Sequence, residues 1–401
     1  MQKFTARQYL QMDIAANHSQ DKADWSDRLA WFQANCTTLR DQVKTAKEPA
    51  LYFAGILAWE ACQKGEPSGY PVSLDATASG LQLLACLTGD RSAAQLCNVV
   101  PTGSRKDAYT VVYNEMTTRL GETSKISREQ AKDAVMTSLY GSTAVPKEVF
   151  GEGLLLQTFY NTMGDVAPAV WELNEAFLQL WDPTALSHDW VMPDGFQVVC
   201  KTMTMVKEVV HFLNEPFDTF TKVNAPVEGG RALGANVTHS VDGMVVREMQ
   251  RRCNYDPKVI AGIRKNLEAN NWAMSWKTTT EDAKMVTKLW DLYKQSGYLS
   301  ARILNHLTYE TLGMVPKAEI EELLNSLPEK PFDIMTIHDC FRSLPNYCND
   351  LREQYNRQLM LVAQSNMLGF ILSQLTGRNI SIGKLDPTLH KDIMQADYAL
   401  S

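Results

Sequence analysis

The spacing of apolar residues along the chain predicts a mostly helical α+β protein with a few short strands. Apolar positions recur every three or four residues over most of the sequence, which is the period of an amphipathic helix. Segments with this period are residues 1–66, 105–120, 146–187, 238–253, 257–324 and 350–375. Three other segments predict β-structure: a strand at 71–75, a hairpin around the Pro-Asp-Gly turn of 188–206, and an apolar run at 332–345. The Gly-rich segment 214–236 predicts an irregular loop.

A helix predicted between Ser127 and Gly141 carries cationic and aromatic side chains along one stripe. Ser127 and Gln130 have the spacing of a capping box, and Gly141 suits the end of the last turn. The stripe contains Arg128, Lys132, Val135, Met136, Leu139 and Tyr140. The tyrosine would lie about 12 Å beyond the lysine. A nucleoside triphosphate, with its anionic head and flat polar tail, fits this stripe, whereas an ordinary amphipathic helix with solvated cations is the alternative interpretation.

Two aspartates lie where a predicted strand ends or turns. Asp75 ends the strand at 71–75 and is followed by a helix with a second capping-box pair, Ser79 and Gln82. Asp339 lies inside the later apolar run, where an unpaired carboxylate would cost several kcal/mol, so it must be paired, exposed at a turn or bound to a cation. Each could be an ordinary turn aspartate. Two carboxylates from separate strands can also hold two magnesium ions about 3.5–4 Å apart, which is the arrangement for in-line phosphoryl transfer.

A second basic cluster lies on the helix predicted at 238–253. Arg247, Arg251 and Arg252 share one end of this segment and could contact phosphate. A solvated helix face is the simpler interpretation of such a cluster.

Composition places the chain among soluble globular proteins of two or three domains. Its 401 residues are 45% hydrophobic and 21% charged, and no apolar run is long enough to span a bilayer. The net charge of −7 does not indicate nucleic-acid binding, although a local cleft can be positive on an acidic body. The eight cysteines form no C-x-x-C pair, which indicates neither zinc nor a disulfide framework and favours a reducing cytoplasm.

Three motifs occur in an order that matches a known family. They are LDATASGLQ around Asp75, REQAKDAVMTSLYG from Arg128 to Gly141, and IHDCF around Asp339. Weaker echoes in the same order are CNVVPTGSRKDAY, HDWVMPDGF, VTHSVDG and DYALS. In these motifs most of the chain resembles the phage-type single-subunit RNA polymerases, relatives of the DNA polymerase I family, in which they would be motifs A, B and C.

This resemblance implies a right-hand polymerase fold with a small antiparallel palm sheet and helical fingers. Residues 1–103 and 240–401 would form the palm, and residues 104–239 the fingers. The implied activity is DNA-directed RNA synthesis by a two-metal-ion mechanism, with Mg²⁺ as cofactor. The ligands would be a DNA template, ribonucleoside triphosphates and the RNA product, and no membrane is involved.

The resemblance also implies roles for individual residues. Asp75, Asp339 and the backbone carbonyl of Ala76 would bind the two magnesium ions. Lys132 would stabilise the phosphates and protonate the leaving group. The other substrate-binding residues would be Arg128, Tyr109, Tyr140 and His239.

Several positions distinguish an RNA polymerase from a DNA polymerase of the same superfamily. DNA polymerases of this kind carry a glutamate that excludes the ribose 2′-hydroxyl where this chain has Gly80. They also tend to have phenylalanine where Met136 stands and glutamate where Cys340 stands. In the RNA polymerases, a tyrosine and a histidine that match Tyr140 and His239 favour the ribose by hydrogen bonding.

The chain departs from the family at Cys340, Arg342 and Asp133, where relatives have serine, glycine and a basic residue. Only 74 residues precede Asp75, and they contain no D-x-x-G-R segment. We therefore expect a second polymerase subunit that carries the N-terminal domain, and possibly a factor that opens DNA or recruits the enzyme to it. A phage-encoded protein in the host cytoplasm is expected. The alternatives are a DNA polymerase or primase of the DNA polymerase I superfamily, and a non-catalytic DNA-binding scaffold.

Overall fold

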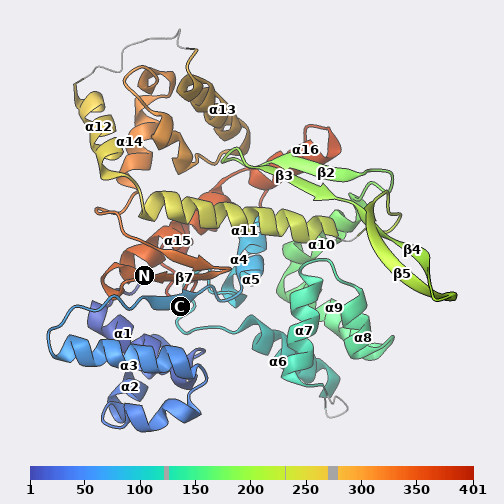
Figure 1. Cartoon of the computed structure of the whole chain (residues 1–401), viewed down its shortest axis with the longest axis horizontal. Coiled ribbons are helices and arrows are strands. Elements are labelled where there is room, and N and C mark those ends of the chain that lie inside the picture. The colour runs from blue at the N-terminus through green and yellow to red at the C-terminus, as the bar shows by residue number, and fades with distance from the viewer. Residues whose placement is uncertain (122–125, 231, 270–278) are drawn as a thin grey trace.

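A computed structural model describes residues 1–121, 126–230, 232–269 and 279–401, and it shows the expected mostly helical α+β fold (Figure 1). The N-terminal helices are α1 (Ala6–Ala15), α2 (Trp25–Asn35) and α3 (Pro49–Gln63). They enclose a small core of their own, to which Ile14, Phe32 and Ile56 contribute. A π-helical turn at Ala16–Gln20 and a 3₁₀-helix at Leu39–Thr45 interrupt the helical run that the apolar period predicted.

A three-stranded antiparallel sheet joins two segments that are far apart in the sequence. Its strands are β1 (Val72–Asp75), β6 (Met335–Ile337) and β7 (Cys340–Ser343), in the order β1-β7-β6. The turn between β6 and β7 is His338–Asp339, and His338 has a positive φ of 54°. The strand predicted at 71–75 and the β-structure predicted at 332–345 are thus confirmed. The 3₁₀-helix Pro345–Tyr347 and α15 (Cys348–Gln364) follow the sheet.

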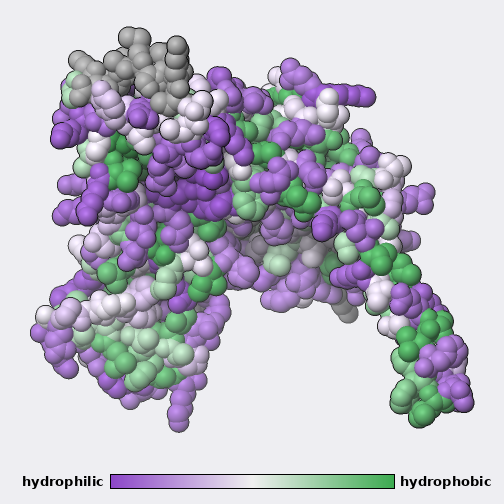
Figure 2. Space-filling model, turned by 45° about the horizontal axis from the view of Figure 1, so that its top comes forward, coloured by the Kyte–Doolittle hydropathy of each residue, from purple (hydrophilic) through white to green (hydrophobic). Residues whose placement is uncertain are grey.

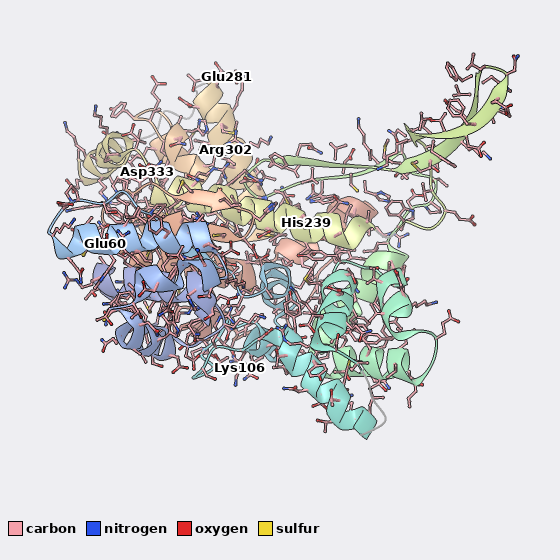
Figure 3. The ribbon with its side chains drawn as sticks, turned by 60° about the horizontal axis from the view of Figure 1, so that its bottom comes forward. Glu60, Lys106, His239, Glu281, Arg302 and Asp333 are labelled. Carbon is pink, nitrogen blue, oxygen red and sulfur yellow. The ribbon has the colours of Figure 1, made fainter. Side chains whose placement is uncertain are left out.

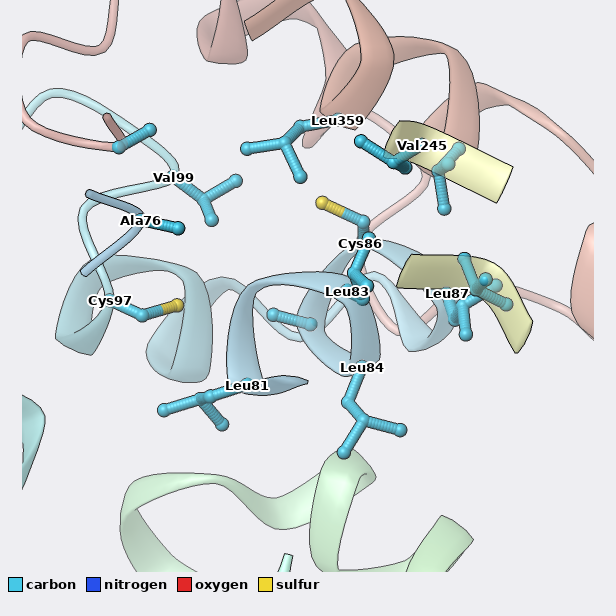
Figure 4. Packing of buried hydrophobic residues seen from close by; sticks show 14 of the residues in the cluster. Ala76, Leu81, Leu83, Leu84, Cys86, Leu87, Cys97, Val99, Val245 and Leu359 are labelled. Atoms are coloured by element: carbon cyan, nitrogen blue, oxygen red, sulfur yellow. The ribbon is translucent and has the colours of Figure 1, made fainter. Parts of the chain in front are cut away.

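Helix α4 (Ser79–Thr88) is the centre of the main core, because each of its ten residues is buried. Its leucines pack against α11 (Ala232–Cys253) and α15, as the side chains of Leu83, Leu87, Val245 and Leu359 show in Figure 4. Burying each such side chain contributes about 1.5–3 kcal/mol. The capping box predicted for α4 is wrong, because Ala78 is the N-cap and no side chain caps the helix.

A group of helices follows α4 at one side of the molecule (Figure 1). It comprises α5 (Arg91–Leu96), α6 (Ala108–Leu120), α7 (Arg128–Ser138), α8 (Ala144–Phe150), α9 (Leu154–Val166) and α10 (Pro168–Gln179). The capping box of Ser127 and Gln130 is present at the start of α7. At its end the Gly141 N–H donates to the Ser138 carbonyl at 3.0 Å, and Ser142 to Thr137 at 3.0 Å. These two bonds form a Schellman motif around Gly141, so both predicted ends of the helix are confirmed.

Two β-hairpins precede α11. The predicted hairpin is formed by β2 (Ser187–Val191) and β3 (Gln197–Lys201). A second hairpin is formed by β4 (Met203–Phe212) and β5 (Glu215–Asn224). The loop predicted at 214–236 is therefore wrong, because β5 and the start of α11 occupy most of it. Gly229 and Gly230 belong to the connection after β5 and Gly234 to α11. The hairpin turns at Leu213–Asn214 without glycine, and both residues have positive φ.

The remaining helices form a second cluster and a C-terminal part. The cluster consists of α12 (Pro257–Glu268), α13 (Glu281–Ser296), α14 (Lys317–Asn325) and the 3₁₀-helices Ala301–His306 and Leu312–Met314. The C-terminal helices are α16 (Met367–Thr376) and α17 (His390–Ile393). All eight cysteines are free thiols. Within the described residues no single helix could cross a bilayer, although the bent pair Pro345–Gln364 and Met367–Thr376 meets the length and composition test together.

The arginine cluster of α11 is buried in ion pairs rather than solvated. Arg247 Nε and Arg251 Nη1 donate to Asp194 in the β2–β3 turn, at 2.6 and 2.9 Å, and the Asp194 side chain is completely buried. Arg252 is buried and donates to Gln354 at 3.1 Å. The solvated face that the sequence predicted is therefore wrong. Arg247 and Arg251 fasten the first hairpin to α11, whereas Arg252 bonds to α15.

Candidate active site

The two aspartates predicted to bind metal lie at the same end of the central sheet. Asp75 is the last residue of β1, and the antiparallel register pairs it with Cys340, which follows Asp339. The Ala76 N–H donates to the Asp339 carbonyl at 3.1 Å and so joins the ends of β1 and β7. The Asp75 side chain is exposed, whereas Asp339 is partly buried. Residues that are distant in sequence are neighbours here because β1 and β7 pair.

Burial and like charge both disfavour ionisation at this end of the sheet. Burial raises the pKa of Asp339, and the nearby negative charge of Asp75 raises it further. On α11, burial and the charge of Asp339 raise the pKa of Asp242 to about 6. Burial raises the pKa of the Cys340 thiol to about 12, and the Asp75 carboxylate adds to this effect. A cation bound between Asp75 and Asp339 would relieve the repulsion, because opposite charge favours the ionised carboxylate.

The carboxylate oxygens of Asp75 and Asp339 fit a magnesium ion. Mg²⁺ prefers oxygen ligands and is usually held by one or two carboxylates, with water and substrate phosphates completing its shell. No described residue donates a hydrogen bond to the Ala76 carbonyl, so this oxygen is also available. In the part of the chain that the structure describes, no three His, Cys, Asp or Glu side chains converge on one point. This donor set suits an ion that is shared with a substrate and not one enclosed by protein.

The last residues of the sequence pack against β1. The Ser401 N–H donates to the Asp75 carbonyl at 2.9 Å, and the Asp75 N–H to the Ser401 carbonyl at 3.3 Å. The Arg105 Nε donates to the Ser401 hydroxyl at 3.1 Å. One feature of the sequence indicated this arrangement: the last residues include the apolar Ala399 and Leu400. Both side chains are buried. The roles of Arg105 and Ser401 beside Asp75 were not expected from the sequence.

Helices α6 and α7 bring three of the predicted substrate residues together. The Lys132 ammonium lies 6.0 Å from the centre of the Tyr109 ring, a cation–π distance. Burial raises the pKa of Tyr109 to about 12, so its hydroxyl keeps its proton at neutral pH. Arg128 is held by other residues: its Nε donates to Thr110 at 2.7 Å, and its Nη2 is paired with Asp107. Arg128 therefore reaches a phosphate only if it leaves Asp107.

Tyr140 and His239 stack on each other although they come from different segments. Their ring centres are 4.9 Å apart and their planes differ by 9°. His239 lies on α11 and is exposed (Figure 3), within the segment that the sequence predicted to be helical. Tyr140 is partly buried, and burial raises the pKa of its hydroxyl, with Asp242 and Asp339 adding to the shift. The stack therefore joins the partly buried ring of Tyr140, which lines a pocket together with Asp339, to the exposed ring of His239.

A pocket of about 210 Å³ connects these elements. Its lining includes Gly80, Tyr109, Met136, Tyr140 and Asp339. Residues from α4, α6, α7 and the β6–β7 turn thus meet around one small space. A larger cavity of about 610 Å³ lies elsewhere, between α13, α14 and α15. We place the candidate site at the smaller pocket, because Tyr109, Tyr140 and Asp339 line it, whereas the larger one is lined by Arg252 alone among the candidate residues.

Gln82 fixes the surroundings of this pocket and was not recognised as a site residue from the sequence. It is completely buried, and its Nε2 donates to the Thr77 hydroxyl at 3.0 Å and to the carbonyls of Cys97 and Ala399 at 2.9 and 2.8 Å. Its Oε1 accepts from the Tyr355 hydroxyl at 2.7 Å. Gln82 therefore joins α4, α15 and the C-terminal residues directly behind Asp75. Its spacing from Ser79 indicated only a cap.

Comparisons with known proteins point to one family. Residues 4–150 match the model of the family described as DNA-dependent RNA polymerase. This segment contains Asp75, Tyr109, Lys132 and Tyr140. Over 166 residues the chain is 29% identical to a mitochondrial DNA-directed RNA polymerase of Neurospora crassa, and the match covers 34% of this chain and 12% of that protein. The N-terminal part of the chain, residues 4–150, is thus similar to DNA-dependent RNA polymerases, and the chain spans only a small part of the length of the relative that it matches.

Proposed function

We propose that the chain is the catalytic part of a DNA-directed RNA polymerase, which adds ribonucleotides to an RNA 3′ end on a DNA template. The observation that carries this proposal is the pairing of β1 with β7. It sets Asp75 beside Asp339, which lines a pocket together with Tyr109 and Tyr140. A non-catalytic scaffold would have no use for two carboxylates that repel each other at the mouth of such a pocket.

In this proposal Asp75, Asp339 and the Ala76 carbonyl hold two magnesium ions. When bound, such ions activate the attacking 3′-hydroxyl and stabilise the charge on the transferred phosphate and the leaving pyrophosphate. The protein's part is to hold both aspartates in place, through the backbone bond between Ala76 and Asp339 and the backbone bonds between Asp75 and Ser401.

The helix α7 orients the nucleotide along the pocket. Lys132 neutralises the phosphates and donates a proton to the leaving pyrophosphate. Its ammonium group lies over the Tyr109 ring, which limits the positions open to it. At the other end Tyr140 and His239 contact the ribose, and a hydroxyl of the sugar can form a hydrogen bond with them. Because Gly80 has no side chain, the 2′-hydroxyl meets no obstacle at that position.

Replacement of each aspartate by asparagine tests the proposal. Asp75→Asn and Asp339→Asn keep the shape but remove the charge, so RNA synthesis on a primed template should fall by at least about 10³-fold, the scale of lost electrostatic stabilisation. Asp333→Asn is the matched control, since Asp333 is an exposed aspartate before β6 (Figure 3). Circular dichroism should show the same fold in all three variants. Substantial synthesis by either active-site variant would refute the assignment.

We also propose that the enzyme works with a second polypeptide. Two features support this: the net charge of −7, which weakens attraction to a polyanion, and the exposed apolar residues Phe53 and Leu57 on α3. The partner would supply a positive surface for DNA and would cover α3. A Leu57→Asp variant should fail to co-purify with the partner, whereas Lys64→Asp at the end of α3 should not. Promoter-specific synthesis on duplex DNA by this chain alone would contradict the proposal.

A further inference from the structure

The central sheet has one buried face and one open face. Residues that pair across antiparallel strands point to the same side, and successive residues point to opposite sides. One face is packed into the core, where Val72, Leu74 and Phe341 are each at most 2% exposed. On the other side, which we call the open face, every residue is at least partly exposed: Ser73, Asp75, Met335, Ile337, Cys340 and Arg342. This surface is separate from the β4–β5 hairpin, which projects from the body with exposed apolar residues of its own (Figure 2).

Arg342 is the only cation among the six residues of the open face. Its Nε is buried without a hydrogen-bond partner, and no described carboxylate forms an ion pair with it. Asp13 interacts with it through space, but the Asp13 carboxylate already accepts from the Tyr70 hydroxyl and the Ser73 N–H. A guanidinium group carries five N–H donors. Arg342 therefore has donors left for an anion that comes from outside the chain.

The position of Arg342 relates this anion to the candidate active site. Arg342 lies two residues beyond Cys340 on β7, which is about 7 Å from the end of the sheet that carries Asp75 and Asp339. On the neighbouring strand β6, Met335 and Ile337 pair with Arg342 and Cys340 and are 49% and 53% exposed. A single cation beside two exposed apolar side chains suits a strand of nucleic acid, because its backbone is anionic and its sugars and bases have apolar surfaces.

We propose that Arg342 binds the phosphate that joins the last two nucleotides of the growing RNA, and that Met335 and Ile337 support the sugar and base beside it. The inference rests on the proposed function, in which the RNA 3′-hydroxyl lies at Asp75 and Asp339. The nearest phosphate of that RNA is one sugar away from the 3′-hydroxyl, a distance comparable to the two residues of β7 between Cys340 and Arg342. An arginine can hold such a phosphate with two parallel hydrogen bonds.

This contact is particular to the chain and not a general property of the motif around Asp339. The family that the motif resembles has glycine where Arg342 stands, and glycine has no side chain with which to bind a phosphate. Arg342 is a positioning residue in this proposal, because it holds the RNA strand and does not touch the reacting atoms.

The test measures one-nucleotide extension of an RNA primer on a DNA template by the full-length chain. The primer is either unmodified or carries an uncharged methylphosphonate at its last linkage. In wild type the lost charge should raise the KM for the primer–template by about tenfold. Arg342→Ala should raise the KM of the unmodified primer by a similar factor and should be nearly insensitive to the methylphosphonate. Arg342→Lys should recover part of the loss, whereas Arg378→Ala, which removes an exposed arginine after α16, should behave as wild type.

Three results would overturn the proposal. They are a wild-type enzyme that is insensitive to the methylphosphonate, an equal effect of the methylphosphonate in wild type and Arg342→Ala, and the same coupling to Arg342 when the modified linkage is placed further upstream. Coupling of Arg342 to a methylphosphonate in the template would assign the arginine to the template strand instead. If the wild-type chain extends no primer, the proposed function fails, whereas extension without coupling to Arg342 rejects only this inference. Unchanged thermal unfolding of the variants serves as the folding control.

Discussion

Gly80 lies directly beneath the phenol ring of Tyr140. A Cβ atom at position 80 would lie 2.9 Å from Tyr140 Cζ and closer still to its hydroxyl oxygen. Because Tyr140 is stacked on His239, it cannot move away from position 80 without breaking the stack. Because Gly80 of α4 has no side chain, the Tyr140 ring can lie in this position after the end of α7.

Gly80→Ala is expected to displace Tyr140 and to weaken the preference for ribonucleotides. The preference should fall by about tenfold, comparable to the loss of one hydrogen-bonding partner, and RNA synthesis should become slower. Incorporation of ribo- and deoxynucleotides by the variant measures this change. Gly262→Ala on α12 is the control, since nothing lies within 4 Å of its added Cβ. An unchanged preference in Gly80→Ala would show that the contact does not govern sugar choice.

Tyr140→Phe should relax sugar selection without abolishing synthesis. The substitution removes one hydroxyl and little volume, so the stack on His239 remains. A site that bonds to a substrate hydroxyl loses discrimination when its partner is removed. The ratio of ribo- to deoxynucleotide incorporation should fall, whereas total incorporation should stay within about tenfold of wild type. The same ratio in both proteins would mean that Tyr140 does not contact the sugar.

Asp194→Asn is expected to destabilise the protein by about 3 kcal/mol. The substitution removes the buried carboxylate that pairs with Arg247 and Arg251 and leaves Arg251 only Glu248, and breaking a buried ion pair on one side is costly. Burial raises the pKa of Asp194, but its arginine partners outweigh this effect and hold the pKa below its usual value. Urea denaturation at pH 7 measures the loss. Asp291→Asn removes only the exposed ion pair with Lys294 and should cost less than about 1 kcal/mol.

Asp13 should make the protein less stable as pH rises, because its pKa is raised on folding. Its carboxylate accepts from the Tyr70 hydroxyl at 2.6 Å and from the Ser73 N–H at 3.0 Å, and burial raises its pKa to about 6. The folded state therefore holds this proton between about pH 4 and pH 6, where the unfolded state has released it. The resulting stabilisation is complete below about pH 4 and is lost as pH rises through 6.

The test for Asp13 compares wild type with Asp13→Asn in urea at several pH values. From pH 4 to pH 7 the stability of wild type relative to the variant should fall by about 3 kcal/mol, since the shift is about two pKa units. The exposed Asp333→Asn variant should show a constant difference from wild type. A constant difference for Asp13→Asn as well would contradict the raised pKa.

Signals within a few residues of each other were sufficient to predict much of this protein. The capping box at Ser127, the stop at Gly141, the strand that ends at Asp75 and the turn at Asp339 all follow from local backbone bonding and side-chain spacing. Local signals failed at Ser79 and Gln82, whose spacing suits a cap. There the side chain of Gln82 finds better partners in segments that are distant in sequence.

By itself the sequence determined the helices, the central strands and the motifs that carry Asp75, Lys132 and Asp339, because these depend on periodicity and on residue order. Only the tertiary structure decided which charges are free and which are paired. Arg128 is paired with Asp107, Arg247 is paired with the buried Asp194, and Ser401 lies against Asp75. Each of these contacts joins separate elements, so it exists only when packing of the core has brought those elements together. The physical reason is that local spacing determines backbone conformation, whereas the partner of a side chain depends on the whole fold.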